Sequence, residues 1–277
     1  MDALLPDEIA RKAEGVGAAK ARLDGLSLFV LAVLAGAFIG LGAMFSITTA
    51  AGMGALPFGL VQFVAGVAFS LGLVLVILGG AELFTGNTLM VMAWASGRIS
   101  LAEMLRAWGI VYAGNFVGAV ATALLVALAG QYLGGGGAVG AKALDLAAAK
   151  AALPWERAFF LGILCNVLVC LAVWLALGAH STADKILAMI LPVAAFVAAG
   201  FEHSVANMYI LPLGLFIKAL AGESFWQAIG ALPSDYAGLT WPAFLWRLIP
   251  VTAGNIIGGG VLVGAVYWFV YLRRREK

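Results

Sequence analysis

Six long apolar segments, separated by short polar stretches, dominate the hydrophobic pattern of the chain. They cover approximately residues 26–50, 57–97, 105–133, 157–178, 186–217 and 247–271. A helix needs about 20 apolar residues to cross a bilayer, and each segment reaches that length. Polar residues interrupt the longer second and fifth segments at 81–88 and 201–204. The pattern predicts an all-α membrane protein of six transmembrane helices, two of them broken.

Composition supports the same class. The 277 residues are 64% hydrophobic and 11% charged, whereas a soluble domain carries about 25% charge. Residues 1–25 are polar and predict a surface helix that begins near Pro6 and Asp7, before a pore domain over 26–272 and a basic tail over 273–277. The net charge of +2 is too small to indicate a nucleic-acid partner.

The two interrupted segments look like copies of each other. Glu82 and Glu202 lie 120 positions apart, as do the following Asn87 and Asn207. A second match, with an offset of 140, joins AGNxxG at 113–118 to AGNxxG at 253–258. Each half then holds three spans, an odd number, so the halves must have opposite topology. The sequence predicts an inverted three-plus-three repeat over about 26–136 and 146–272, with a transport site where the broken helices meet.

Positive charge predicts the orientation. An even number of spans puts both termini on one side of the membrane, and that side receives eleven of the sixteen Lys and Arg residues. Loops rich in Lys and Arg face the cytoplasm. We therefore expect both termini of this multi-pass protein in the cytoplasm. The membrane is expected to be the bacterial inner (cytoplasmic) membrane.

His203 is the only histidine predicted at membrane depth. One interpretation makes it a proton donor, or a hydrogen-bond donor, to a permeating anion. The other makes it a partner for backbone groups that the helix break releases. Burial disfavours its charged form and a nearby anion favours it, so the ring could protonate when an anion is present.

Glu82 and Glu202 carry charge where lipid makes it costly, by roughly 2.5–3.5 kcal/mol for a helix-centre acid. They could carry protons. Because both halves have one, we favour a structural role, in which each carboxylate accepts hydrogen bonds at its helix break.

Several other residues offer polar groups or constrictions. Thr85, Asn166 and Asn255 could face the pore, or could join helices through hydrogen bonds, as could Asn115. Lys150 is either a solvated loop charge or an attractant for anions. Apolar rings that exclude hydrated ions are expected at Phe69, Leu73 and Phe196, although a Phe alone more often packs.

The chain resembles the formate/nitrite transporter family from about residue 15 onward. The resemblance is carried by GGAELFTGN at 79–87, LGILCN at 161–166, GFEHSVANM at 200–208 and TAGNIIGGG at 252–260. The resemblance implies an aquaporin-like fold in a homopentamer with one pore per protomer. It also implies permeation of formate, nitrite or hydrosulfide. The formate branch is nearest, although Thr85-Gly86-Asn87 differs from the Thr-Ser-Thr of enteric formate channels, and its Thr-Gly form also occurs in nitrite-type members.

By the same resemblance, His203 is the central pore histidine, with Asn255 near it. Thr85 lies on the loop that breaks the second segment, and Lys150 lies at the periplasmic vestibule. Phe69, Leu73 and Phe196 are the two hydrophobic constrictions. We expect no cofactor or metal and, besides the anions, only membrane lipid and further copies of the chain as partners.

Other classes fit the residues less well. A membrane hydrolase needs a nucleophile facing a base, and the adjacent His203 and Ser204 do not face each other on a helix. A haem or metal electron carrier needs more membrane-embedded ligands than one histidine. A water or glycerol channel would carry Asn-Pro-Ala, which the chain lacks. The expected function is therefore passage of a small anion, with proton sharing at His203.

Overall fold

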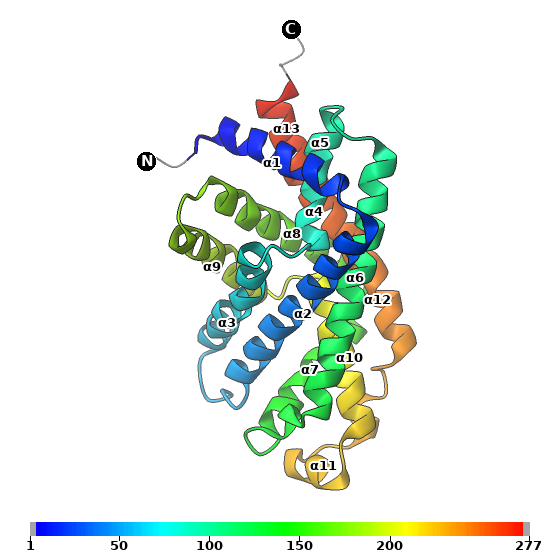
Figure 1. Ribbon diagram of the computed structural model, residues 1–277. Coiled ribbons are helices and arrows are strands. Elements are labelled where there is room, and N and C mark those ends of the chain that lie inside the picture. The colour runs from blue at the N-terminus through cyan, green and yellow to red at the C-terminus, as the bar shows by residue number, and fades with distance from the viewer. Residues whose placement is uncertain (1–3, 274–277) are drawn as a thin grey trace.

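A computed structural model describes residues 4–273, and its regular structure in that range is entirely helical (Figure 1). The first half holds α1 (Pro6–Ala21), α2 (Gly25–Ala50), α3 (Phe58–Leu78), α4 (Phe84–Asn87), η1 (Thr88–Met90), α5 (Val91–Ala95) and α6 (Leu101–Leu128). After η2 (Gln131–Leu133), the second half holds α7 (Ala138–Ala152), α8 (Trp155–Gly178), α9 (Thr182–Ala198), α10 (Ser204–Leu220), α11 (Glu223–Ile229), η3 (Pro233–Tyr236), α12 (Trp241–Ile256), the π-helix η4 (Ile257–Ala265) and α13 (Val266–Tyr271). The predicted basic tail lies outside the described residues except for Arg273.

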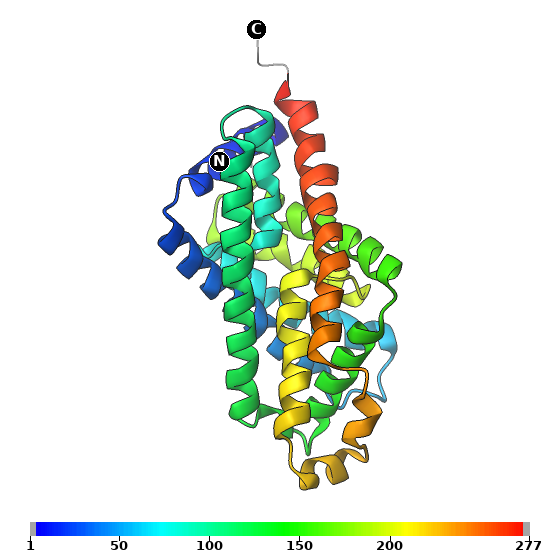
Figure 2. The same ribbon diagram turned by 90° about the vertical axis from the view of Figure 1, so that its right-hand side faces the viewer.

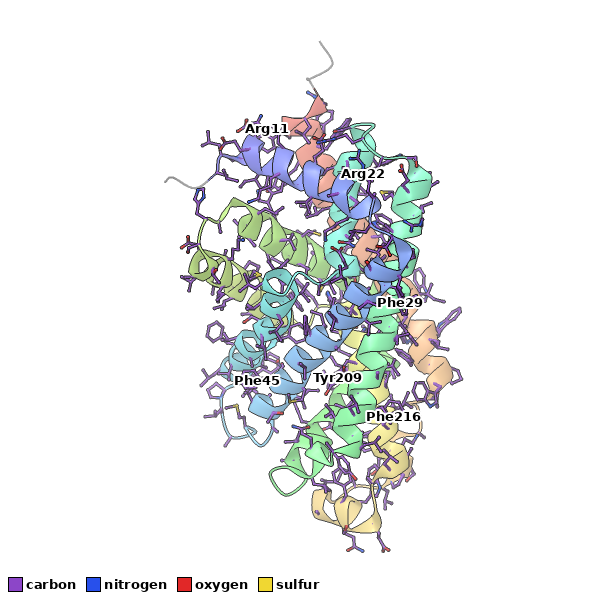
Figure 3. All side chains as sticks on the ribbon, viewed as in Figure 1. Arg11, Arg22, Phe29, Phe45, Tyr209 and Phe216 are labelled. Atoms are coloured by element: carbon purple, nitrogen blue, oxygen red, sulfur yellow. The ribbon has the colours of Figure 1, made fainter. Side chains whose placement is uncertain are left out.

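Five helical stretches of the described chain are long and apolar enough to cross a bilayer, or six if the bent pair α10 and α11 counts as one span. The chain is a multi-pass membrane protein. Helices α1 and α13 lie at one end of the molecule, where Figure 3 labels Arg11 and Arg22, and α11 lies at the other. We call these ends the α1 face and the α11 face.

The two halves pack alike and run in opposite directions. Helix α2 packs against α6 and α3, and α8 packs against α12 and α9. Helix α2 follows α1 directly, so it begins at the α1 face. Helix α8 ends there, because the carbonyl of Gly178 accepts a hydrogen bond from the Leu4 amide. The predicted all-helical fold with two inverted halves is confirmed.

Each helix break begins at a glycine in the left-handed region. Gly80, with φ of +71°, follows the end of α3, and Gly200, with φ of +68°, follows the end of α9. The next residue bends back in each case: the Ala81 amide donates to Val76 O and the Phe201 amide donates to Phe196 O, both at 2.9 Å. A left-handed glycine is the common device for ending a helix. The irregular segments are therefore 79–83 and 199–203, slightly earlier than the polar residues alone indicated.

A helix that the apolar pattern did not predict lies outside the six segments, and one predicted span is not a regular α-helix. Residues 138–152 form α7, so Lys150 lies in the last turn of a helix and not in a loop. The last span contains a nine-residue π-helix that joins α12 to α13 in one continuous rod (Figure 2). Within it, a side chain at Gly259 would overlap Thr88 and Asn166, so the glycine permits close contact with η1.

Gly118 and Gly109, both on α6, give a matched test of helix packing. A methyl group at Gly118 would overlap the backbone carbonyl of Val33 on α2, whereas one at Gly109 has no neighbour within 4 Å. We expect Gly118→Ala to destabilise the protein by about 1–3 kcal/mol, as overpacking does, and Gly109→Ala to be neutral or slightly stabilising. Thermal unfolding in detergent measures the difference. Equal stability of the two variants would contradict the close α2–α6 approach.

Candidate functional site

An asparagine clamps each helix break from a neighbouring helix. In the first half, Asn115 of α6 accepts from the Phe84 amide at 2.8 Å and donates to the carbonyls of Ala32 and Glu82 at 2.7 and 2.9 Å. In the second half, Asn255 of α12 accepts from the Ser204 amide at 2.9 Å. It donates to the carbonyls of Gly162 and Glu202 at 2.8 and 2.9 Å. Both side chains are fully buried, and they satisfy backbone groups that the breaks would otherwise leave without partners.

The glutamate at each helix break also forms an ion pair, and its carboxylate is buried. Lys150 on α7 bonds Glu202 at 2.6 Å, and the Asn207 amide donates to the other carboxylate oxygen at 2.6 Å. The carboxylate is thus held by a cation and an amide. This geometry is the arrangement that a buried charge requires.

The first half repeats this network with Lys20 of α1. Its ammonium lies 2.9 Å from Glu82 and donates to the Asn87 side chain at 2.7 Å, while that side chain donates to Glu82 at 2.8 Å. Sequence reasoning missed Lys20, because it lies in the polar N-terminal segment, 62 positions before its partner. The N-terminal helix is therefore fixed directly to the first helix break.

The two breaks meet at Thr85 and His203. The hydroxyl of Thr85 lies 3.0 Å from His203 Nε2, and both residues are buried. The repeat partners of this pair, 120 positions away, are Val205 and Leu83. Each half thus supplies one polar side chain where the other half has an aliphatic one. The scaffold is symmetric, and the polar contact at its centre is not.

His203 also caps the helix that follows it. Its Nδ1 accepts a hydrogen bond of 3.0 Å from the Ala206 amide, the third residue of α10. Because Nδ1 accepts, the neutral ring carries its proton on Nε2 and donates it to the Thr85 oxygen. The Thr85 hydroxyl proton is then left to donate to a third group. A second proton on the ring would have to displace the cap.

Asn166 joins the two halves of the repeat next to Thr85. Its amide nitrogen lies 2.6 Å from the carbonyl of Asn255, 3.2 Å from that of Thr85 and 3.1 Å from the Thr88 hydroxyl. The residue is fully buried, and its side chain fixes the backbone beside the Thr85 hydroxyl. Asn166, Asn255 and Thr85 line neither of the two cavities described next.

Two cavities approach the centre from opposite faces. The α1-face cavity, of about 250 Å³, is lined by α1 and by Leu73, Val76 and Leu83 at its inner end. The α11-face cavity, of about 150 Å³, is lined by α7 and by Phe69, Phe196 and His203. Phe69 and Phe196 meet edge to face with ring centroids 5.6 Å apart, and the Phe196 ring stacks on His203 at 5.9 Å.

The predicted site residues therefore fall into three groups. His203, Lys150 and the predicted constriction residues Phe69, Leu73 and Phe196 line the cavities. Thr85, Asn166 and Asn255 line neither cavity and are held by buried hydrogen bonds. Glu82 and Glu202 lie in the ion pairs at the breaks. Within residues 4–273, no three His, Cys, Asp or Glu side chains gather so as to hold a metal ion.

Known proteins are similar to this chain in sequence and in fold. The family model for the formate/nitrite transporter matches residues 7–269. The formate channel FocA of Escherichia coli (strain K12) is 46% identical over 276 residues, which cover 99% of this chain and 97% of that protein. The formate channel FocA of Haemophilus influenzae is 41% identical over 95% of this chain and 93% of its own length.

Solved structures agree with these relatives. A pentameric formate channel with formate bound superposes with a TM-score of 0.85 at 44% identity, covering 90% of this chain and 98% of that one. An ion channel of the FNT family gives a TM-score of 0.80 at 33% identity, covering 95% and 98%. The family model, the relatives and the solved structures agree, and the chain therefore belongs to the formate/nitrite transporter family.

Proposed function

We propose that this protein carries formate across the bacterial inner membrane, through one pore in each protomer of a homopentamer. The relatives named as formate channels, and the similar pentamer with formate bound, support this substrate and assembly. Nitrite and hydrosulfide are the alternative substrates within the family. The eleven Lys and Arg residues assigned to the α1 side support cytoplasmic termini.

The observation that carries the proposed mechanism is the Thr85–His203 contact between two cavities, one lined by Leu73 and the other by Phe69 and Phe196. A bare anion in a narrow apolar pore loses its hydration without compensation, which is costly. At the centre, the Thr85 hydroxyl is free to donate to the anion, because its oxygen already accepts from His203 Nε2. The hydroxyl proton of Thr85 and the Nε2 proton of His203 can then be shared with formate. The species that passes Phe69, Phe196 and Leu73 is closer to neutral.

Uptake of labelled formate into liposomes that hold the purified protein tests the proposal. Uptake should rise when the external solution is made acidic, since proton sharing then has a larger supply of protons. Unlabelled nitrite and hydrosulfide serve as competitors. Stronger competition by either anion than by formate would change the substrate, and no flux of any of the three would refute the proposed function.

Thr85→Val replaces the hydroxyl with the side chain type of its repeat partner Val205, at nearly constant volume. We expect formate flux to fall by about ten- to a hundredfold, because the loss of one hydrogen bond to a charged group corresponds to about 1.5–3 kcal/mol. Thr85→Ser, which keeps the hydroxyl, should retain most of the flux. Initial uptake rates measure both variants. If Thr85→Val took up formate as fast as Thr85→Ser, the hydroxyl would have no part in the mechanism.

A further inference from the structure

The repeat extends to α1 and α7, which precede the first spans of the two halves. Lys20 and Lys150 bond the glutamates of their respective breaks and lie 130 positions apart. The same offset relates Val16 to Leu146 and Lys12 to Lys142. Each of these two helices therefore carries an inner and an outer lysine.

On each helix these residues follow one another at intervals of four, so they lie along one face. Lys12, Val16 and Lys20 line the α1-face cavity. Lys142, Leu146 and Lys150 line the α11-face cavity. Eight residues of helix correspond to about 12 Å, so each outer lysine lies two turns from the inner one. The inner lysine is the one bound to the central break, which places the outer lysine toward the mouth of each cavity.

Within residues 4–273, the inner lysines have charged partners, and the outer lysines do not. The ammonium groups of Lys20 and Lys150 are paired with buried carboxylates, so each pair has no net charge. Lys12 donates to the uncharged carbonyl of Leu177 at 2.7 Å, and Lys142 forms no ion pair with any residue of the described range. The inner pairs therefore attract a distant anion only weakly, whereas the outer lysines retain a full charge.

Nearby carboxylates of the described chain form no ion pair with the outer lysines. Glu8, one turn before Lys12, accepts from the Leu5 amide at 2.7 Å, and Glu14 pairs with Arg98. Asp145, one turn after Lys142, accepts from the Tyr236 hydroxyl at 2.9 Å. None of these acids lines either cavity.

We propose that Lys12 and Lys142 are the anion-capture residues at the two mouths, and that Lys20 and Lys150 hold the helix breaks. The inference rests on the proposed function and assigns the entry step to side chains outside the central site. A single fixed charge in a low-dielectric mouth concentrates small anions there, and salt screens its effect. Beside Lys12, the α1-face cavity also holds Lys185, so loss of the outer lysine should weaken capture more at the α11 face.

The test compares wild type, Lys12→Gln, Lys142→Gln and the double variant in liposomes with labelled formate. At about 10 mM ionic strength the screening length is about 30 Å. Under that condition we expect the double variant to reach half-saturation at a formate concentration roughly three- to tenfold higher than wild type does. Its maximal flux should stay that of wild type, since the central site is unchanged. At about 1 M salt the difference should disappear.

Arg157→Gln is the matched control for each single lysine variant, because Arg157 is exposed and lines neither cavity, and its loss also lowers the net charge by one. Lys142→Arg keeps the charge and should behave as wild type. The inference is wrong if Lys142→Gln saturates like Arg157→Gln, or if the maximal flux of the double variant falls while its half-saturation stays that of wild type. Absence of flux in the wild type itself would instead overturn the proposed function, and this inference with it.

Discussion

A His203→Phe variant is expected to lose both the acid-dependent rise in formate uptake and at least about tenfold of the flux at low pH. The phenyl ring keeps the stacking on Phe196 but removes Nε2, which faces Thr85 at 3.0 Å. The anion then meets no ring proton, and the Thr85 oxygen has no donor. General acid–base groups typically contribute about 10²–10⁴-fold to a rate, so a tenfold loss is a conservative expectation. Uptake between neutral and acidic pH measures it.

The substitution also removes a helix cap, so it needs a control for folding. His203 Nδ1 accepts from the Ala206 amide, and loss of such a cap costs about 0.5–2 kcal/mol. Asparagine caps helices well but does not titrate. His203→Asn should therefore keep the thermal stability of wild type and still lose the pH response. A variant at this position that kept the wild-type pH dependence would eliminate the proton-sharing step.

The helix breaks and their central histidine could be predicted from the sequence because their signals are local. A charged residue at membrane depth and a glycine before it mark each break, as Glu82 follows Gly80 and Glu202 follows Gly200. The asymmetry at the centre could also have been found by aligning the repeats, since His203 falls opposite Leu83. These features depend on residue type and spacing alone.

The partners of the break residues could not be predicted in the same way. Lys20 and Glu82 meet because α1 folds across the α1 face, and no local pattern in the polar segment signals that contact. Asn166 could have faced the pore or another helix, and periodicity does not distinguish these cases. The three acceptors around its amide come from two different halves of the chain. Only the packing of the halves brings them together.

The two lysine–glutamate pairs are expected to differ in their contribution to stability. The side chains of Lys150 and Glu202 are 13% and 5% exposed, against 25% and 8% for Lys20 and Glu82. Removing one partner of a buried pair leaves an uncompensated charge, at a cost of about 3–5 kcal/mol. Solvent at Lys20 reduces that cost. We expect Lys150→Met to lower the thermal midpoint in detergent more than Lys20→Met does.

A double variant separates the cost of an orphaned charge from the loss of an attraction. In Lys150→Met/Glu202→Gln no charge stays buried, and the Gln side chain can still accept from the Asn207 amide that now donates to Glu202 at 2.6 Å. Replacing both partners of a buried pair by neutral groups is often nearly neutral for stability. The double variant should therefore recover most of the decrease in thermal midpoint caused by Lys150→Met. It should still assemble into the proposed pentamer. A double variant as unstable as Lys150→Met would mean that the lysine stabilises α7 through contacts other than its charge, and that Glu202 does not depend on it.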